Sequence, residues 1–170
     1  MRIYKLITEA TQYFTDDIGN PLLVFHGTDN EFNEFHSGKG SGSMGESVGY
    51  YFTDSKDAAM YYSNTGKVIS AYLKLNNPLI IPARMIDRSE MSQIVGVDLE
   101  SVYAVPDRAE VYWFLKNGDA YDGRNTNVGT IVSTAIRNKG HDGVIFKERI
   151  NGRLVTVYTV FDSNQITIVS

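Results

Sequence analysis

The sequence predicts an α+β domain, and three observations lead to that prediction. Segments with the residue patterns of strands and of helices occur in mixed clusters, without the strand–helix alternation that builds a parallel doubly wound sheet. Asn151-Gly152, a strong signal for a two-residue hairpin turn, joins two strand-like segments near the C-terminus. The length of 170 residues suits one well-buried domain, so residues 1–170 are expected to fold together.

Composition excludes several classes of protein. The chain is 42% hydrophobic and 21% charged, which is typical of a globular protein and not of a disordered or fibrous one. It has no cysteine, and its three histidines lack the close spacing of a metal site, so no metal is expected. No apolar run approaches the ~20 residues of a membrane span, and the N-terminus lacks a signal-peptide pattern, so a cytoplasmic location with no membrane partner is expected.

The net charge of −4 gives no general attraction to the phosphates of nucleic acids. Binding to them would therefore need a local basic patch. A group of basic residues near the C-terminus is the best candidate, although an ordinary solvated surface is the simpler explanation of it. Its members are Arg137, Lys139, Lys147, Arg149 and Arg153.

The first part of the chain predicts a helix, a turn, a buried strand and a long loop. Helical spacing of apolar residues indicates an amphipathic helix over residues 3–14, within an N-terminal helical region of residues 1–18. Turn-forming residues follow at 16–20. Residues 22–25 are all apolar, which favours a strand buried on both faces. Residues 29–48 lack periodicity and are rich in small residues, so a flexible loop is expected there.

The middle of the chain predicts two strands around a short helix. The aromatic run at residues 49–54 is typical of a strand, and Asp54 is expected to cap the helix that follows. Apolar residues alternate with polar ones over residues 67–75, which predicts a strand with one buried face. Three side chains of the intervening helix are expected to face the core, those of Ala58, Ala59 and Tyr62.

The remaining elements follow from helical spacing, alternation and turn residues. Residues 117–127 have no periodicity, so a loop is expected there. The other expected elements are a strand at 79–81, helices at 84–94, 107–116 and 128–138, and strands at 143–148, 154–162 and 166–169.

Polar residues end the apolar strand at the point where it should reach the surface. Gly27 lets a ligand approach the backbone because it has no Cβ, and His26 and Thr28 add hydrogen-bonding side chains beside it. These three residues are candidates for the floor of a binding site. The alternative is a strand that ends in a turn, with His26 as an ordinary half-buried histidine.

Five segments occur in an order that resembles a known family. They are Gly19 to Thr28 with its His-Gly-Thr ending, Gly49 to Asp54, Asn77-Pro78-Leu79, Asp142-Gly143-Val144 and Tyr158 to Ile166. The pattern resembles the ADP-ribosyltransferase fold in its poly(ADP-ribose) polymerase and diphtheria-toxin branch, and in particular the ADP-ribosyltransferase-like domain of polyvalent proteins of phages and mobile elements. The resemblance is weakest over residues 83–127. It implies split, mostly antiparallel β-sheets that form an NAD cleft and are flanked by helices.

The resemblance also implies NAD⁺ as the donor of ADP-ribose, with residues 29–48 as a flap beside it. His26 would hydrogen-bond the ribose hydroxyls, and Gly27 would present backbone groups to the nicotinamide amide. Tyr51 would stack on the nicotinamide ring, opposite a second tyrosine for which Tyr62 and Tyr61 compete; a flat cationic ring favours such aromatic faces. The implied NAD-binding residues are His26, Gly27, Thr28, Tyr51, Ala59, Tyr62 and Val157, and the implied catalytic residues are His26, Tyr51 and Glu148.

The third catalytic position departs from the family's pattern. The family's glutamate usually directly precedes the aromatic residue of the final strand, a place that Val157 occupies here. The loss of such a stabilising group weakens catalysis by about two to three orders of magnitude. Glu148, on the preceding strand, is a candidate substitute, and a solvated charge between Lys147 and Arg149 is the alternative reading of it.

Taken with the resemblance, the sequence indicates a mono-ADP-ribosyltransferase, a glycosyltransferase that moves ADP-ribose from NAD⁺ to a macromolecule and releases nicotinamide. The expected acceptor is a host protein in the bacterial cytoplasm, and a nucleic acid acceptor stays open. Polymer elongation is not expected without the family's glutamate. Two alternatives remain: a degenerate module that binds NAD or ADP-ribose without chemistry, and an NAD⁺ glycohydrolase.

Overall fold

A mostly antiparallel β-sheet is the centre of the structure, a computed structural model that describes residues 13–36, 49–102, 105–115, 118–119, 125–126 and 128–169. Only the pair β4 and β9 is parallel among the pairs of this sheet. The predicted α+β class is therefore confirmed. In sheet order the strands are β11 (Ile166–Ile168), β3 (Val68–Leu73), β1 (Leu23–Gly27), β2 (Tyr50–Thr53), β10 (Arg153–Val160), β9 (Gly143–Ile150) and β4 (Leu79–Ile81).

The sheet is split near its middle. β1 pairs with β3 through five residue pairs and β10 with β9 through eight, but β1 and β2 share the single pair Phe25↔Thr53. The sheet thus consists of one half, β11-β3-β1, and another half, β2-β10-β9-β4, joined at one position. This matches the split sheet that the resemblance implies.

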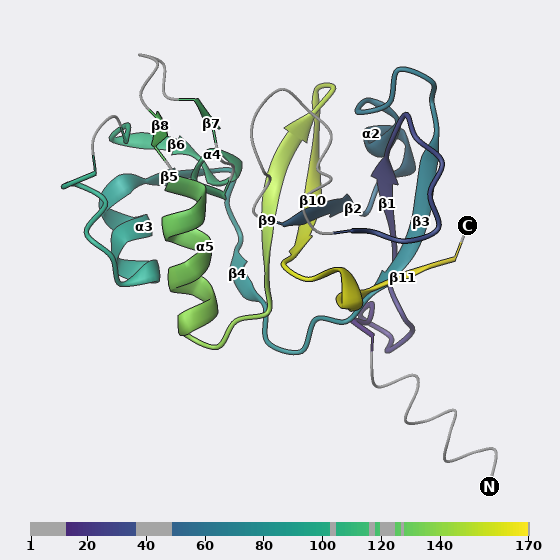
Figure 1. The fold of residues 1–170 in the computed structure, drawn as a ribbon, viewed down its shortest axis with the longest axis horizontal. Coiled ribbons are helices and arrows are strands. Elements are labelled where there is room, and N and C mark those ends of the chain that lie inside the picture. The colour runs from purple at the N-terminus through teal and green to yellow at the C-terminus, as the bar shows by residue number, and fades with distance from the viewer. Residues whose placement is uncertain are drawn as a thin grey trace, which may run out of the picture.

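Two hydrophobic cores lie on opposite faces of the sheet. Directly paired residues share a face, so Phe25, Thr53, Val157 and Phe146 point one way and their chain neighbours point the other. The first face packs against α3 (Arg88–Val95), α4 (Val111–Leu115) and α5 (Val128–Asn138), which gather beside β4 and β9 in Figure 1. The second face holds a smaller core that includes Val24, Phe52, Leu73 and Tyr158.

α2 (Lys56–Met60) covers the other half of the sheet, beside β1. Its N-cap is Ser55, whose hydroxyl accepts a hydrogen bond from the Ala58 N–H at 3.2 Å, so the prediction that Asp54 caps the helix is wrong. The Asp54 carboxylate instead accepts the N–H of Thr156 on β10. Ala58 and Ala59 are buried as predicted, but the helix ends at Met60 and leaves Tyr62 58% exposed, because Tyr62 lies one turn beyond the buried stripe.

The strongest local signals of the sequence are confirmed. α5 begins at Val128 and ends at Asn138, as its helical spacing predicts, and Gly140 with φ +87° follows it. Asn151 and Gly152 both have positive φ, 47° and 79°, in the turn between β9 and β10. This is the conformation that an Asn-Gly hairpin turn requires.

Two of the predicted helices begin as strands. Residues 84–94 and 107–116 start with β5 (Met85–Asp87) and β6 (Arg108–Glu110), which pair with each other before α3 and α4 begin. The helical interpretation fails because this pairing is long-range: each short strand has one buried residue, Ile86 or Ala109, and three residues are too few to separate a strand pattern from a helical one. In the expected loop at 117–127, β7 (Gly118–Asp119) pairs with β8 (Asn125–Thr126).

The N-terminal predictions are only partly tested. Most of the predicted helix, residues 1–12, lies outside the described residues, as does 37–48 of the predicted loop. Residues 13–18 are not helical, because Thr15 forms a β-bridge with Pro21 around the turn at 16–20. The expectation that the first strand is buried on both faces is wrong at Leu23, which is 38% exposed where the sheet face reaches solvent.

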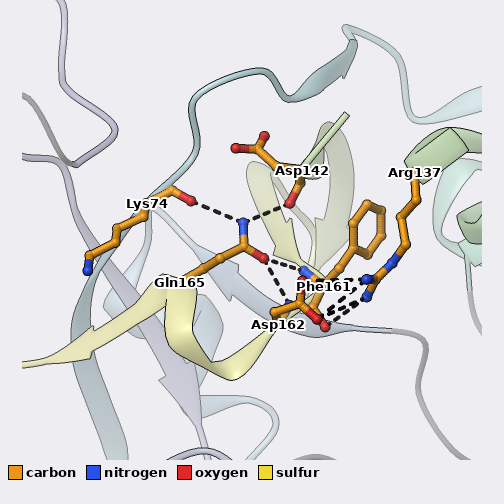
Figure 2. A network of polar contacts seen from close by, with 6 residues as sticks. All are labelled: Lys74, Arg137, Asp142, Phe161, Asp162 and Gln165. Atoms are coloured by element: carbon orange, nitrogen blue, oxygen red, sulfur yellow. Dashed lines mark hydrogen bonds and ion pairs between the residues drawn. The ribbon is translucent and has the colours of Figure 1, made fainter. Parts of the chain in front are cut away.

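A buried amide ties the ends of three strands together (Figure 2). The Gln165 side chain accepts the N–H groups of Phe161 and Asp162 through Oε1, and its Nε2 donates to the carbonyls of Lys74 and Asp142. The Asp142 carboxylate in turn accepts the N–H groups of Asn76 and Asn77. The 3₁₀ helix η1 (Ser163–Gln165) brings Gln165 to this place. One side chain therefore joins the end of β3, the start of β9 and the end of β10.

We expect Gln165→Ala to lower the free energy of unfolding by about 3 kcal/mol, because it leaves two N–H groups and two carbonyls without their partner. Gln93→Ala is the matched control, since Gln93 is exposed on α3 and should change stability by less than about 0.5 kcal/mol. Urea denaturation followed by circular dichroism measures both. Equal midpoints for the two variants would contradict the structural role of Gln165.

Candidate functional site

A cavity of about 730 Å³ opens at the split between β1 and β2. Its size is that of a pocket for a cofactor or small ligand. The cavity is lined from both faces of the sheet, by His26 and Phe35 from one and by Tyr51 and Val157 from the other. All eight residues that the sequence nominated line it together, namely His26, Gly27, Thr28, Tyr51, Ala59, Tyr62, Glu148 and Val157.

The backbone of Gly27 faces the cavity because the β1–β2 ladder stops short of it. The Thr28 N–H bonds to Lys67 on the β3 side, so by alternation the N–H and C=O of Gly27 point toward β2. The next hydrogen-bonded pair after Phe25↔Thr53 would join Gly27 to Tyr51, and this pair is not formed. Gly27 therefore presents one donor and one acceptor at the split.

His26 bonds to the Tyr51 carbonyl, which a longer β1–β2 ladder would have paired with Gly27. Its Nδ1 donates a hydrogen bond to the Tyr51 carbonyl at 2.8 Å, and its ring packs against Phe35 and Phe52 at centroid distances of 5.2 and 5.5 Å. Burial lowers the pKa of His26 below its usual value, more than the hydrogen bond to Tyr51 raises it. A neutral ring that donates from Nδ1 leaves Nε2 as a hydrogen-bond acceptor.

Gly27 is a glycine for a reason that the sequence did not reveal. A Cβ at this position would lie 1.9 Å from the Ala59 carbonyl oxygen and 3.2 Å from the Tyr62 Cβ. The close neighbour of Gly27 is thus the backbone of α2. Ala59 is 1% exposed and supplies this wall of the cavity mainly through its backbone.

Thr28 serves the turn beside the cavity. Its hydroxyl accepts the N–H of Asn30 at 3.1 Å, and its carbonyl accepts the hydroxyl of Ser63 at 2.9 Å. Ser63 also donates to Asp29, whose carboxylate accepts the N–H of Thr65. These bonds connect the end of β1 to the turn after α2, so Thr28 fixes the position of the Gly27 backbone.

Four tyrosines line the cavity, Tyr50, Tyr51, Tyr62 and Tyr112, and of the two that the sequence nominated Tyr51 is fixed and Tyr62 is exposed. The Tyr51 hydroxyl donates to the Leu115 carbonyl at 3.2 Å and its ring meets Tyr112 edge-on at 5.3 Å, which fixes the ring against α4. Burial raises the pKa of Tyr51, so its hydroxyl stays protonated. Tyr62 stands 58% exposed, with Tyr61 edge-on to it at 5.8 Å. Of the two competing tyrosines after α2, Tyr62 lines the cavity and Tyr61 does not.

Glu148 is buried, so its interpretation as a solvated charge is wrong. The residue is 7% exposed, and its Oε1 accepts the N–H of Arg149 at 2.8 Å. Its Oε2 is buried and has no hydrogen-bond partner among the described residues. Burial raises the pKa of Glu148 and the neighbouring Glu110 adds to the increase, whereas the Arg149 N–H and Arg84 oppose it.

Glu148 and Val157 project from the same face of the sheet. Val157 pairs with Phe146, and Glu148 follows Phe146 by two residues on β9. The next pair on the same face as Val157↔Phe146 is Val155↔Glu148, so Glu148 is the diagonal neighbour of Val157 on the adjacent strand. Val157 itself is 5% exposed and apolar. The sheet thus brings one carboxylate beside the position where the sequence has valine.

A family model for "ADP-Ribosyltransferase in polyvalent proteins" matches residues 16–170. The chain belongs to this family. The match spans both halves of the split sheet and every nominated site residue. Neither a search of the curated proteins nor a search of the solved structures found a significant match.

Some residues of this ADP-ribosyltransferase domain's cavity were not foreseen. Tyr112 comes from α4, within the residues 83–127 where the family resemblance is weakest, and no local sequence pattern marks it as a site residue. Phe35 and Phe32 lie at the start of the predicted loop, where they form an edge-on pair at 4.8 Å. Glu31, Glu34 and His36 also line the cavity. Lys67 pairs with Glu31 at 2.7 Å.

The five basic residues near the C-terminus of the domain do not form one patch. Arg137 lies over the Phe161 ring and pairs with Asp162, and Lys139 donates to the Ile94 carbonyl. The others lie on the β9–β10 hairpin, where Lys147 donates to Thr156, Arg149 to Gly152 and Arg153 to Asp57. Across the described parts of the chain, no helix could span a membrane and no group of side chains could hold a metal ion.

We expect the imidazole of His26 to titrate below its usual value of about 6.5, because protonation would charge a buried ring. Its stabilising effect on the fold is complete above pH 6.5 and is lost as the pH falls through the lowered pKa, since the unfolded chain then binds the proton first. Two-dimensional ¹H–¹⁵N NMR of the ring measures the midpoint and the Nδ1–H tautomer, with His26→Asn for assignment. A midpoint above 6.5 would contradict this reading.

Proposed function

We propose that the domain transfers ADP-ribose from NAD⁺ to a macromolecular acceptor and releases nicotinamide. The observation that carries the proposal is the convergence at one split of the Gly27 backbone, the His26 ring and the buried Glu148 carboxylate. Family membership supports ADP-ribosyl transfer in general. The donor, the single transfer and the acceptor are the proposed parts.

The Gly27 end of the cavity fits the nicotinamide. A primary amide needs one acceptor for its NH₂ group and one donor for its carbonyl, and the Gly27 C=O and N–H supply both at the unformed ladder position. The ring is flat and cationic in NAD⁺, so it gains from the aromatic faces of Tyr51 and Tyr62. The cation is lost when nicotinamide leaves, which favours release of the product.

The His26 and Glu148 side chains fit the ribose and the reacting centre. A ribose hydroxyl donates to Nε2 of the neutral His26 ring, which its Nδ1 bond to Tyr51 holds in place. The bond between ribose C1′ and the nicotinamide nitrogen breaks, and its electron pair leaves with nicotinamide. A nucleophilic atom of the acceptor forms the new bond to C1′, and its proton passes to the Glu148 carboxylate. The positive charge that develops on the ribose is stabilised by the same carboxylate.

Val157 favours a second candidate function. Without a carboxylate at that position the domain loses the group that normally orients an acceptor, so NAD⁺ hydrolysis or binding without chemistry are the competing functions. In the proposal, Glu148 favours transfer over both competing functions, because its carboxylate is buried and lies near Val157 on the same face of the sheet. A single transfer follows, since chain elongation needs an acceptor ribose held by the missing group.

The proposed acceptor is a protein of a bacterial host, in keeping with a domain family of polyvalent proteins. An assay with NAD⁺ labelled in the adenosine part and a bacterial lysate tests the whole proposal. Label on protein supports transfer, and label on nucleic acid would replace the acceptor class. Free ADP-ribose alone would establish the hydrolase, and saturable binding without either product would establish the binding module.

We expect Tyr62→Ala to weaken NAD⁺ binding about fivefold to tenfold, because it removes one aromatic face worth about 1 kcal/mol. Tyr61→Ala is the matched control, since the neighbouring tyrosine is similarly exposed and does not line the cavity. Isothermal titration calorimetry with NAD⁺ measures both dissociation constants. The proposed stacking is wrong if the two variants bind NAD⁺ equally.

We expect Glu148→Gln to reduce the rate of transfer about 10²- to 10³-fold while NAD⁺ binding changes little. Glu100→Gln, which changes an exposed glutamate in the turn region after α3, is the control and should retain the wild-type rate. The wild-type rate should fall as the pH is lowered through the raised pKa of Glu148, because the protonated acid accepts no proton. Wild-type turnover by Glu148→Gln would remove Glu148 from the mechanism.

A further inference from the structure

Among the buried polar atoms that have no partner in the described residues are Oε2 of the cavity residue Glu148 and Nε of Arg84. One is an acceptor and the other a donor, and the Arg84 Nε lies 4.0 Å from the other carboxylate oxygen of Glu148. Buried donors and acceptors are rarely left unpaired, so an unpaired donor this close to a carboxylate with an unpaired oxygen needs an explanation. Arg84 does not itself line the cavity.

The fold brings Arg84 to Glu148 by extending the β4–β9 pairing. β4 ends at Ile81, opposite Phe146, and the next contact is the Lys147 N–H bonded to the Ala83 carbonyl. Arg84, the residue after Ala83, therefore lies beside Glu148, the residue after Lys147. The Arg84 carbonyl accepts the Val111 N–H at 2.8 Å, which also fixes the backbone next to Glu110.

The guanidinium of Arg84 forms its hydrogen bond with a different carboxylate, that of Glu110. Its NH2 donates to Oε1 of Glu110, a residue of β6 whose side chain is 37% exposed. One cation thus stands between two carboxylates, bonded to the exposed one and just out of hydrogen-bond distance of the buried one. Both carboxylates are therefore potential partners of the same guanidinium.

We infer that Arg84 is the positioning residue of Glu148, and that it sets the charge of the Glu148 carboxylate by dividing one guanidinium between Glu148 and Glu110. While Arg84 stays on Glu110, burial raises the pKa of Glu148. When Arg84 turns to Glu148, the carboxylate is ionised and held toward the cavity. The inference rests on the proposed function only for the catalytic use of Glu148.

Other groups that face Glu148 do not explain this arrangement. Tyr112 of α4 and Tyr62, in the turn after α2, lie within electrostatic reach of Glu148 on the cavity side, and neither is a cation. Arg149, the next residue of β9, contributes its backbone N–H, while its own guanidinium donates to Gly152. Arg84 is therefore the described cation that acts on the carboxylate through its side chain.

Carboxyl ¹³C NMR of ¹³C-glutamate-labelled full-length protein tests the inference without NAD⁺, with Glu148→Gln for assignment. Arg84→Gln should raise the midpoint of Glu148 by about one pH unit, and Glu110→Gln should lower it, because it removes an anion and frees the guanidinium. The double variant should return toward the wild-type midpoint. Asp107→Asn, which breaks the separate Arg88–Asp107 pair, should leave Glu148 unchanged.

An unchanged Glu148 midpoint in both single variants would overturn the inference and leave Arg84 as a structural link to β6. Should Arg84→Gln fail to fold, Glu110→Gln alone decides, since it keeps Arg84 and its backbone bond to Val111. In the transfer assay the acid limb of the pH–rate profile should move with the NMR midpoint. A midpoint that shifts in a protein without transferase activity would refute the proposed function and retain the role of Arg84.

Discussion

The hydrogen bond from His26 to the Tyr51 carbonyl is the contact on which the site depends. It occupies the carbonyl that a continuing β1–β2 ladder would pair with Gly27, and so ends the ladder after one residue pair. The consequence is a sheet whose halves separate at this point, with backbone groups directed into the space between them. A cavity lined from both faces of one sheet exists because the strands stop pairing there.

The same contact explains why the neighbouring residues have the types they have. Gly27 has no Cβ because the α2 backbone at Ala59 closes over it, and the end of β1 is tied to the turn after α2 through Thr28 and Ser63. The His26 ring keeps its place between Phe35 and Phe52. Packing on one side and hydrogen bonding on the other thus hold His26 and Gly27 in the cavity lining.

Motifs that mark the family need not lie at the site. Three segments of the pattern that pointed to an ADP-ribosyltransferase do not line the cavity. They are Asn77-Pro78-Leu79, Asp142-Gly143-Val144 and Tyr158 to Ile166. They meet instead in the polar network around Gln165, where four buried backbone groups depend on one amide. Their spacing reflects the closure of the sheet. The cavity is lined instead by the His-Gly-Thr segment and by residues of β9 such as Glu148.

The sequence by itself determined the class of fold, the late hairpin, α5 and eight of the residues around the cavity, because each depends on a local pattern or on a motif of the family. Only the tertiary structure decided that Glu148 is buried beside Val157, since strand register and the β4–β9 pairing place Arg84 and Glu110 around it. Burial of a charged side chain is a property of its distant neighbours. No local pattern in residues 143–150 separates a desolvated glutamate from a solvated one.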